Sequence, residues 1–304
     1  MKYLVTGGAG FIGTNTVKQL LAAGHEVRVL DNYIAGKKPE RFQSGAEYVE
    51  GDVRNRDDIN RAIQNIQGIF HLAAVPRVPY SVEYPDITHD HNVNGTLNVL
   101  LAARDNSVKR VVFAASSSIY GGDKGKITMT EDVGFNPKSP YALQKLIGAE
   151  YCRLFSELYK LETVSLVYFN IYGPYADPDG AYALVIGKFL KQRAEGRPLT
   201  ICGDGEFYRS YTHVADCATA NILAMTSDQV GKGELINIGN QETYSVNQLA
   251  ALIGGPTENV SPRLGDVRYT KAGINKAKEL LGWEPKISLE EGIRELKKEF
   301  RISS

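Results

Sequence analysis

The stretch Thr6-Gly7-Gly8-Ala9-Gly10-Phe11-Ile12-Gly13 lies between a short apolar run and a helical pattern near the start of the chain. Within it, Gly8, Gly10 and Gly13 match the spacing of a turn that binds a dinucleotide between a strand and a helix. Glycines are needed because the turn is tight, the backbone approaches a pyrophosphate closely, and the first N–H groups of the helix face that anion. The stretch therefore predicts a strand, a dinucleotide-binding turn and a helix, in that order.

Asp31 ends the second apolar run, where a dinucleotide-binding unit carries the acid that binds its ribose. A carboxylate accepts hydrogen bonds from a ribose 2′-hydroxyl but repels a 2′-phosphate, so Asp31 favours NAD over NADP. Lys37 and Lys38 lie farther along the chain, and we interpret them as solvated loop charge. NAD is therefore the predicted cofactor.

Outward from this unit, short β-branched runs alternate with helical patterns as far as residue 169. This order predicts an α/β fold, a doubly wound parallel sheet of the Rossmann type. We expect residues 1–169 to form the NAD-binding domain, with returning segments from about 211–240, and residues 170–304 to form mainly a smaller, mixed α/β substrate-binding lobe. A capping box at Ser288 and Glu291 predicts a final helix over residues 289–300. The predicted strands, nearly continuous in apolar residues, are 3–6, 26–31, 46–50, 68–71, 110–114 and 163–169.

The composition excludes several classes of protein. Lys plus Arg and Asp plus Glu both number 35 in 304 residues, so the net charge of zero lacks the basic surplus of a nucleic-acid binder. No apolar run approaches membrane-spanning length, and the early glycines leave no room for a signal peptide. Cys152, Cys202 and Cys217 match no metal or redox spacing and are expected as core residues of a cytoplasmic protein. His89 and His91 lie two positions apart on a predicted helix and face different ways, so we assign no metal.

A Tyr-x-x-x-Lys pattern occurs three times, at Tyr33/Lys37, Tyr120/Lys124 and Tyr141/Lys145, so placement must choose among them. Only the last pair opens a helix, since Ser139-Pro140 precedes it and an apolar periodic run follows; the other two pairs lie in Gly-rich loops. Four-residue spacing places Tyr141 and Lys145 on one face of that helix.

The predicted chemistry of this pair is proton transfer by a phenol. Lowering a tyrosine pKa from about 10 to about 7 requires roughly 4 kcal/mol of preferential phenolate stabilisation. A Lys145 ammonium, together with a positive nicotinamide ring, is the expected source in a partly dry cleft. Ser116, at the end of the fifth strand, is placed to hydrogen-bond the reacting hydroxyl. The predicted catalytic residues are Tyr141, Lys145 and Ser116.

These motifs resemble those of the extended short-chain dehydrogenase/reductases, and the match covers nearly the whole chain. His71-Leu72-Ala73-Ala74 and Asn92-Val93-Asn94-Gly95-Thr96 are two further motifs in family order. The resemblance also implies a homodimer joined through helices at residues 86–104 and 141–159. The cofactor contacts that it implies are Gly7, Gly10, Phe11, Ile12, Gly13, Asp31, Asn32, Asp52, Val53, Ala73, Ala74, Asn92, Tyr141, Lys145 and Tyr168.

The same resemblance implies that a nucleotide sugar binds beyond the catalytic helix. Asn170, Arg209 and Arg263 are expected to face its diphosphate, because the planar fork of arginine donates two parallel hydrogen bonds to phosphate oxygens. The implied substrate contacts are Ser116, Ser117, Tyr141, Asn170, Val185, Arg209, Arg263, Asp266 and Thr270.

The residues after Ser116 bear on the reaction. Family dehydratases and decarboxylases look different there, where an acid assists, whereas this chain has Ser117 and Ser118. The resemblance therefore favours a UDP-hexose 4-epimerase that oxidises C4 transiently: Tyr141 takes the 4-hydroxyl proton while hydride passes to NAD, and the 4-keto sugar turns over and is reduced from its other face.

The sugar is expected to include N-acetylated UDP-hexoses. The segments 177–186 and 265–268, together with Asn170, most resemble the corresponding segments of epimerases that act on UDP-GlcNAc and UDP-GalNAc. We expect such an enzyme to accept UDP-Glc and UDP-Gal as well. Thr270 falls where the family places a size gate, with a bulky tyrosine in enzymes restricted to glucose and galactose. Two alternatives stay open. One is a UDP-glucuronate 4-epimerase in which Arg77 binds the sugar carboxylate, and the other is a non-catalytic NAD-binding regulatory protein.

Overall fold

The computed structural model describes residues 1–122, 125–179, 184–261 and 267–302. Its larger part is one sheet of seven parallel strands in the order β12-β7-β5-β4-β1-β2-β3. The order reverses beside β1, which is the mark of a doubly wound fold and confirms the predicted architecture. The strands are β1 (Lys2–Thr6), β2 (Glu26–Asp31), β3 (Ala46–Glu50), β4 (Gly68–His71), β5 (Arg110–Ser116), β7 (Glu162–Tyr168) and β12 (Lys232–Ile238).

Six of these strands lie where their apolar runs predicted them, and only β5 extends two residues beyond its predicted end. The seventh strand, β12, comes from the part of the chain expected to return to the sheet, and it pairs in parallel with β7. The strand ends that carry Thr6, His71 and Ser116 therefore meet at the carboxyl edge of one sheet, where open α/β sheets bind ligands.

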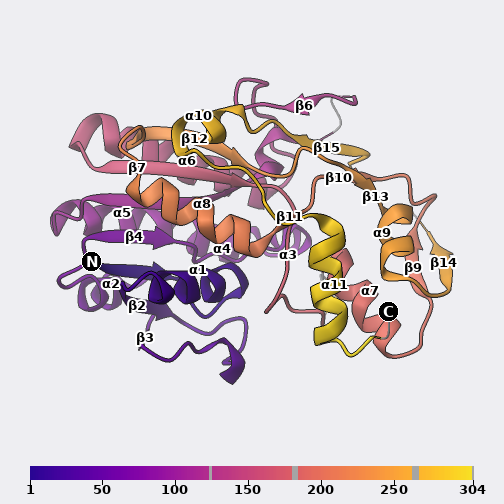
Figure 1. Ribbon diagram of the computed structural model, residues 1–304. Coiled ribbons are helices and arrows are strands. Elements are labelled where there is room, and N and C mark those ends of the chain that lie inside the picture. Colours follow the sequence, from indigo (N-terminus) through magenta and orange to yellow (C-terminus); the bar gives the residue numbers. More distant parts are fainter. Residues whose placement is uncertain (123–124, 180–183, 262–266, 303–304) are drawn as a thin grey trace.

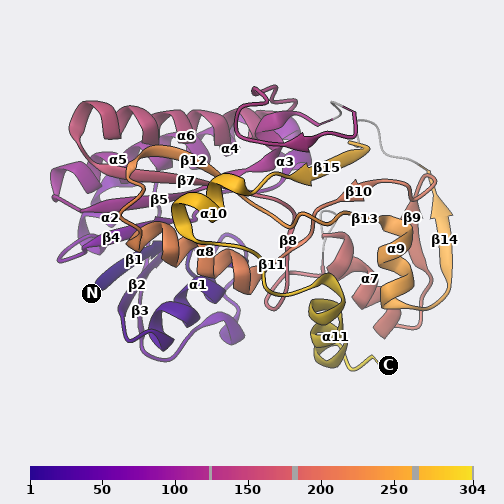
Figure 2. The ribbon, with the colours of Figure 1, turned by 45° about the horizontal axis from the view of Figure 1, so that its top comes forward.

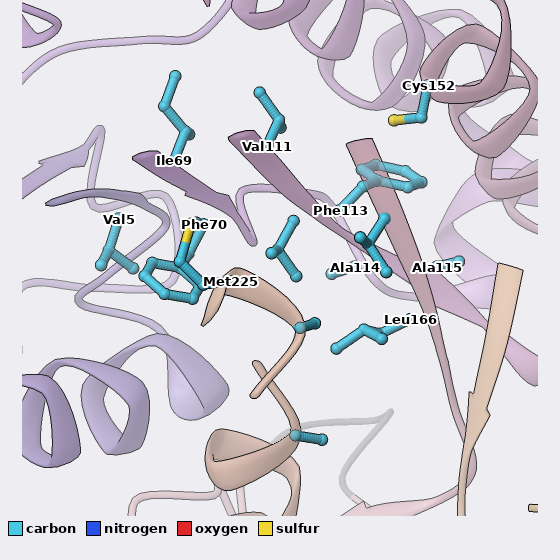
Figure 3. Packing of buried hydrophobic residues seen from close by; sticks show 14 of the residues in the cluster. Val5, Ile69, Phe70, Val111, Phe113, Ala114, Ala115, Cys152, Leu166 and Met225 are labelled. Atoms are coloured by element: carbon cyan, nitrogen blue, oxygen red, sulfur yellow. The ribbon is translucent and has the colours of Figure 1, made fainter. Parts of the chain in front are cut away.

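Helices cover both faces of the sheet (Figures 1 and 2). One face carries α1 (Phe11–Ala22), α8 (Val214–Thr226) and α10 (Asn275–Leu281), and the other carries α2 (Arg56–Ala62), α5 (Gly95–Asp105) and α6 (Pro140–Tyr159). Figure 3 shows how alternate strand residues serve the two faces, with Phe70 on the side of Met225 from α8 and Phe113 on the side of Cys152 from α6. This double burial explains why β1, β4, β5 and β7 are apolar at most positions, whereas the edge strand β3 has no fully buried residue.

Short elements connect β4 to β5 and carry part of the site. They are α3 (Val78–Glu83), α4 (Pro85–His89) and a π-helical turn, η2 (Asp90–Asn94), which runs directly into α5. Two 3₁₀ turns, η1 (Pro39–Arg41) and η3 (Ser117–Tyr120), follow β2 and β5.

The smaller lobe lies to the right of the large sheet in Figure 1. It has its own buried apolar cluster, built around Phe189, Leu199, Leu249 and Leu296. The helix α11 begins with both hydrogen bonds of the predicted capping box, between Ser288 and Glu291. Its elements are α7 (Val185–Ala194), α9 (Val246–Ile253), α11 (Leu289–Glu299), β9 (Leu199–Cys202) and β14 (Thr257–Val260).

Very short strands join the two parts. They are β6 (Thr128–Met129), β10 (Tyr208–Arg209), β13 (Tyr244–Ser245) and β15 (Tyr269–Ala272) in one sheet, and β8 (Ile171–Tyr172) with β11 (Thr212–His213) in another. None of the helices in the described part of the chain is long and apolar enough to cross a membrane.

Candidate active site

The glycine turn has the geometry of a close-approach site. Gly7 has a φ of +70°, and a Cβ there would lie 2.7 Å from the backbone N of Ala73. A Cβ on Gly13 would lie 2.1 Å from the Gly7 carbonyl oxygen, so this helix residue packs directly on the turn. Gly10 caps α1 without a side-chain hydrogen bond, while Phe11 and Ile12 open the helix. The first N–H groups of α1 are thus presented as an anion site requires, and the turn fits a dinucleotide pyrophosphate.

Asp31 joins the end of β2 to this turn. Its carboxylate accepts hydrogen bonds from the backbone N–H groups of Ala9 (2.9 Å) and Tyr33 (2.8 Å). Burial raises the pKa of Asp31, and the two backbone N–H groups act in the opposite direction. Each carboxylate oxygen retains a second lone pair, so Asp31 can still receive a ribose hydroxyl, which fits NAD.

Arg41 is a component of this region that sequence reasoning missed. Only 4% exposed, it donates to the carbonyl oxygens of Ala9 (3.5 Å) and Tyr175 (2.7 Å). A second link between the same two loops is the ion pair of Lys38 with Asp177, at 3.0 Å. The prediction that Lys38 is only a solvated loop charge was therefore wrong, because Lys38 forms an ion pair with Asp177 of the smaller lobe.

Asn32 and Asp52 are brought together beyond β2 and β3. The Asn32 amide donates to the Asp52 carboxylate at 2.8 Å, and Arg54 donates to it at 2.8 Å. Burial alone would raise the pKa of Asp52, but the hydrogen bonds from Arg54 and Asn32 lower it to about 2. Val53 is buried against Gly95 of α5, where a Cβ would lie 2.7 Å from the valine side chain.

The strand-end alanines and two polar residues complete the predicted cofactor set. Ala73 and Ala74 directly follow β4, with the Ala73 N–H facing Thr6 Oγ1 at 3.4 Å. Asn92 is 2% exposed and binds both the N–H and the carbonyl oxygen of Val75. The Tyr168 hydroxyl donates to Asn221 of α8 at 2.8 Å. Because protein groups engage these two side chains, the structure gives them a packing role beside any cofactor contact.

Tyr141 occupies the first turn of α6. Ser139 caps the helix, accepting from the Ala142 N–H at 3.2 Å, and Pro140 opens it as the sequence predicts. The Tyr141 N–H donates to Ser81 Oγ of α3 at 3.1 Å, a partner that lies 60 residues away and that sequence reasoning missed. Tyr120 and the Tyr33/Lys37 pair are set differently: Tyr120 is buried and donates to Asn237 at 2.7 Å, and Lys37 lies over the Tyr33 ring. Lys124 lies outside the described residues.

Ser116 forms a directed chain with Tyr141. Its Oγ accepts hydrogen bonds from the hydroxyl of Ser118 (3.0 Å) and from the Ser118 N–H (3.4 Å). With both acceptor positions used, the Ser116 O–H is free to donate to the Tyr141 phenol, to which it is hydrogen-bonded. Ser117 lies between Ser116 and Ser118 in the sequence and begins η3. The arrangement holds a phenol oxygen and a serine hydroxyl together at the carboxyl end of β5.

Lys145 lies one turn after Tyr141 on α6 and is also buried. Its Nζ donates to the Ala114 carbonyl oxygen at 2.8 Å, and burial lowers its pKa to about 7. Burial also raises the pKa of Tyr141, against the smaller effect of the Ser116 hydrogen bond. In the polypeptide alone, burial therefore dominates the pKa of Tyr141, and the lowering expected from Lys145 together with a positive nicotinamide ring stays a prediction.

The buried Lys145 predicts a pH-dependent stability. Its pKa is about 7 in the folded chain and about 10.4 when unfolded, so between these values the unfolded chain binds more protons and stability rises with pH. Lys145→Met removes this dependence. We expect the variant to have a higher unfolding free energy than the wild type. This difference between the two proteins is expected to be larger at pH 6 than at pH 9, by on the order of 2 kcal/mol. Urea unfolding of both proteins without added NAD measures it, and a difference that does not change with pH would contradict the buried titration.

A cavity of about 190 Å³ is lined by residues of the smaller lobe and of the short strands that join it to the large sheet. Asn170, Val185 and Arg209 line it, so three predicted substrate residues from distant segments are brought together. Thr270 pairs in strand register with Arg209. Arg263 and Asp266 lie outside the described residues. Lining residues that the sequence did not indicate include Thr200, Cys202 and Phe207.

Two features of the cavity wall are polar and constrained. Asn170 adopts a φ of +39° and donates its amide to the Ser210 carbonyl oxygen at 2.9 Å. Such a left-handed backbone is tolerated by asparagine and is common at binding sites. Tyr211 is 4% exposed, its hydroxyl has no hydrogen-bond partner in the described part of the chain, and burial raises its pKa to about 12.

Comparisons with known proteins agree with this geometry. The sequence profile of the NAD dependent epimerase/dehydratase family matches residues 3–239. A putative UDP-glucose 4-epimerase of Methanocaldococcus jannaschii is 38% identical over 298 residues, covering 96% of this chain and 95% of the relative. The crystal structure of UDP-glucose 4-epimerase with UDP-glucose from Thermotoga maritima superposes with a TM-score of 0.93 at 37% identity, covering 99% of each chain. A UDP-N-acetylglucosamine 4-epimerase from Methanobrevibacter ruminantium superposes with a TM-score of 0.92 at 32% identity, covering 99% of this chain and 98% of the other. This chain therefore belongs to the NAD-dependent epimerase/dehydratase family.

Proposed function

We propose that the chain is an NAD-dependent UDP-hexose 4-epimerase, an isomerase that acts by transient oxidation at C4. The observation that carries the proposal is the hydrogen-bonded chain Ser118–Ser116–Tyr141 at the carboxyl edge of the sheet, on the edge that also carries the glycine turn. The related UDP-hexose 4-epimerases support it.

In the proposed mechanism the protein binds and orients the sugar and moves one proton. NAD, when bound, supplies reversible hydride acceptance. The Tyr141 oxygen takes the proton of the 4-hydroxyl and later returns it, while Ser116 donates a hydrogen bond that holds the Tyr141 oxygen in place. Burial of Tyr141 and Lys145 excludes water from the exchange. Asn170 and Arg209 are proposed to hold the nucleotide diphosphate in the 190 Å³ cavity, with Arg263 from outside the described residues.

The experiment is incubation with UDP-GlcNAc, UDP-Glc and UDP-glucuronate, with NMR detection of the epimer at C4. Conversion of UDP-GlcNAc is the expected result. Conversion of UDP-glucuronate alone would favour the alternative in which Arg77, at the start of α3, binds the sugar carboxylate. NAD binding without turnover of any sugar would favour the regulatory alternative.

Thr270→Tyr tests the substrate range. Thr270 pairs with Arg209 of the cavity wall, and the family resemblance implies a size gate at this position, so we expect a tyrosine there to compete with an acetamido group. We expect turnover of UDP-GlcNAc to fall more than about tenfold and turnover of UDP-glucose to stay within about threefold. Steady-state kinetics on both sugars measure the difference, and equal losses would rule out the gate.

We further propose a division of labour along the chain. Residues 1–169 with returning segments from about 211–240 bind the cofactor, since β12 and α8 belong to the large sheet and its cover. Residues 170–304 mainly bind the substrate. Three free cysteines support a reducing, cytoplasmic location.

A homodimer is proposed through α4, α5 and α6. Support comes from large apolar side chains left exposed on α4 and α6: Ile87, Leu143, Leu154 and Leu158, the last 66% exposed. The area is continuous with Val78 and Val82 of α3, since α3, α4 and α6 pack together. Sedimentation equilibrium tests the oligomeric state.

A further inference from the structure

Gln144 lies on α6 between Tyr141 and Lys145 and is only 3% exposed. Its side-chain oxygen accepts a hydrogen bond from the Asn92 amide at 2.8 Å. Its nitrogen donates to Thr88 Oγ1 at 3.0 Å and to the Pro85 carbonyl oxygen at 3.3 Å. Pro85 O can only accept, so the orientation of the Gln144 amide is fixed. Through these three hydrogen bonds the buried Gln144 side chain joins α6, which carries Tyr141, to α4 and η2.

Asn92 extends the connection to the cofactor side of the sheet. Its oxygen accepts from the Val75 N–H at 2.8 Å and its nitrogen donates to the Val75 carbonyl oxygen at 3.2 Å. Val75 follows Ala73 and Ala74, which leave the end of β4 beside the glycine turn. Asn92 sits in the π-helical turn η2, and such turns are rare and often occur at functional sites.

We propose that Gln144 is a positioning residue for the epimerisation, holding the start of α6 against η2 and the segment after β4. This inference rests on the proposed function. Positions 141, 144 and 145 share one helix face, so a shift of the helix at Gln144 displaces both Tyr141 and Lys145. The Ser81 bond to the Tyr141 N–H anchors the same turn from α3.

Gln144→Met tests the proposal, because methionine keeps the length of the side chain and removes its hydrogen bonds. We expect kcat on UDP-GlcNAc to fall about 10- to 100-fold, since a displacement of about 1 Å at a reacting group costs up to about 10² in rate. KM is expected to stay within about threefold, because the substrate cavity is lined from other segments. NAD affinity, measured by calorimetry, is also expected to stay within about threefold, since Asn92 keeps both bonds to Val75.

Gln19→Met is the matched control. Gln19 of α1 also bridges two helices, donating to the Ala215 carbonyl oxygen at 2.9 Å and accepting from Thr219, but it lies away from Tyr141. We expect its kcat to stay within about twofold of the wild type, with a lowered melting temperature.

Gln144→Glu provides a second readout that a merely structural role would not give. A protonated carboxyl can accept from Asn92 and donate to Thr88 as the amide does, whereas a carboxylate cannot donate. We expect kcat of the folded Gln144→Glu variant, relative to the wild type, to recover as the pH falls, while Gln144→Met stays low throughout. A Gln144→Met variant with more than half the wild-type kcat, or a Gln144→Glu variant with no recovery, would overturn this inference alone. A wild-type chain without epimerase activity would overturn the proposed function with it.

Discussion

Replacing Tyr141 by phenylalanine is expected to leave a folded protein that binds NAD and has lost at least about 10³-fold in kcat. The phenol oxygen is the only atom removed, and general acid–base catalysis by one positioned group contributes about 10² to 10⁴ in rate. The ring remains buried, at 8% exposure in the wild type, so the fold loses mainly the Ser116 hydrogen bond. Turnover of UDP-GlcNAc, with NAD affinity by calorimetry, measures the two effects separately.

Ser116→Ala is the companion variant for that measurement. It removes the donor to the phenol and leaves the phenol in place, so its loss of kcat is expected to be smaller than that of Tyr141→Phe. A Tyr141→Phe variant that retains a tenth or more of the wild-type turnover would remove Tyr141 from the proposed mechanism. Loss of NAD binding in the same variant would instead show that the substitution lowers turnover by disturbing the fold of the site.

Replacing Arg110 by methionine is expected to destabilise the protein by about 3–5 kcal/mol, because removing one partner of a buried charge network leaves the others unsatisfied. Arg110 begins β5 and is 3% exposed, at the edge of the sheet opposite the site. Two of its acceptors lie in the last turn of α8, so it also caps that helix. Its guanidinium donates at 2.7–3.0 Å to Glu162 and to the carbonyl oxygens of Ala224, Met225, Ser227 and Val230.

The melting temperature of Arg110→Met is expected to fall by roughly 10 °C, as measured by calorimetry. Arg61→Met is the control, since Arg61 is 60% exposed and its ion pair with Asp58 is a surface pair. Such pairs contribute about 0–1 kcal/mol, so its melting temperature should barely change. Equal stability of the two variants would show that the Arg110 network does not hold α8 to the sheet.

Much of the fold could be predicted from the sequence because its signals are local. A strand buried on both faces must be apolar at almost every position, and β4, with all four residues buried, lies at its predicted bounds for this reason. The capping box of α11 is likewise a relation between residues three positions apart. β5 was predicted two residues too short, because its polar last residue, Ser116, does not look like a buried strand.

The candidate site was predictable only in part. Tyr141 and Lys145 could be selected because their helix start has its own signals, in Ser139 and Pro140. Their roles stay predictions, as do those of Asn170, Arg209 and the other site residues. The lowering of the Tyr141 pKa expected with NAD bound also stays a prediction. In the polypeptide alone burial raises this pKa, and the sequence does not reveal how deeply a hydroxyl or an amine is buried.

By itself, therefore, the sequence determined the glycine turn, the parallel sheet and the helix that carries Tyr141, since each depends on residues within a few positions of one another. Only the tertiary structure decided which distant polar groups meet: Ser81 with Tyr141, Asn92 with Gln144, and Arg41 with Tyr175 are separated by 60, 52 and 134 residues. A buried polar group needs a hydrogen-bond partner in the right position, and many kinds of side chain, as well as the backbone, can provide one. The identity of the partner is fixed when the core closes around it, and no local spacing records it.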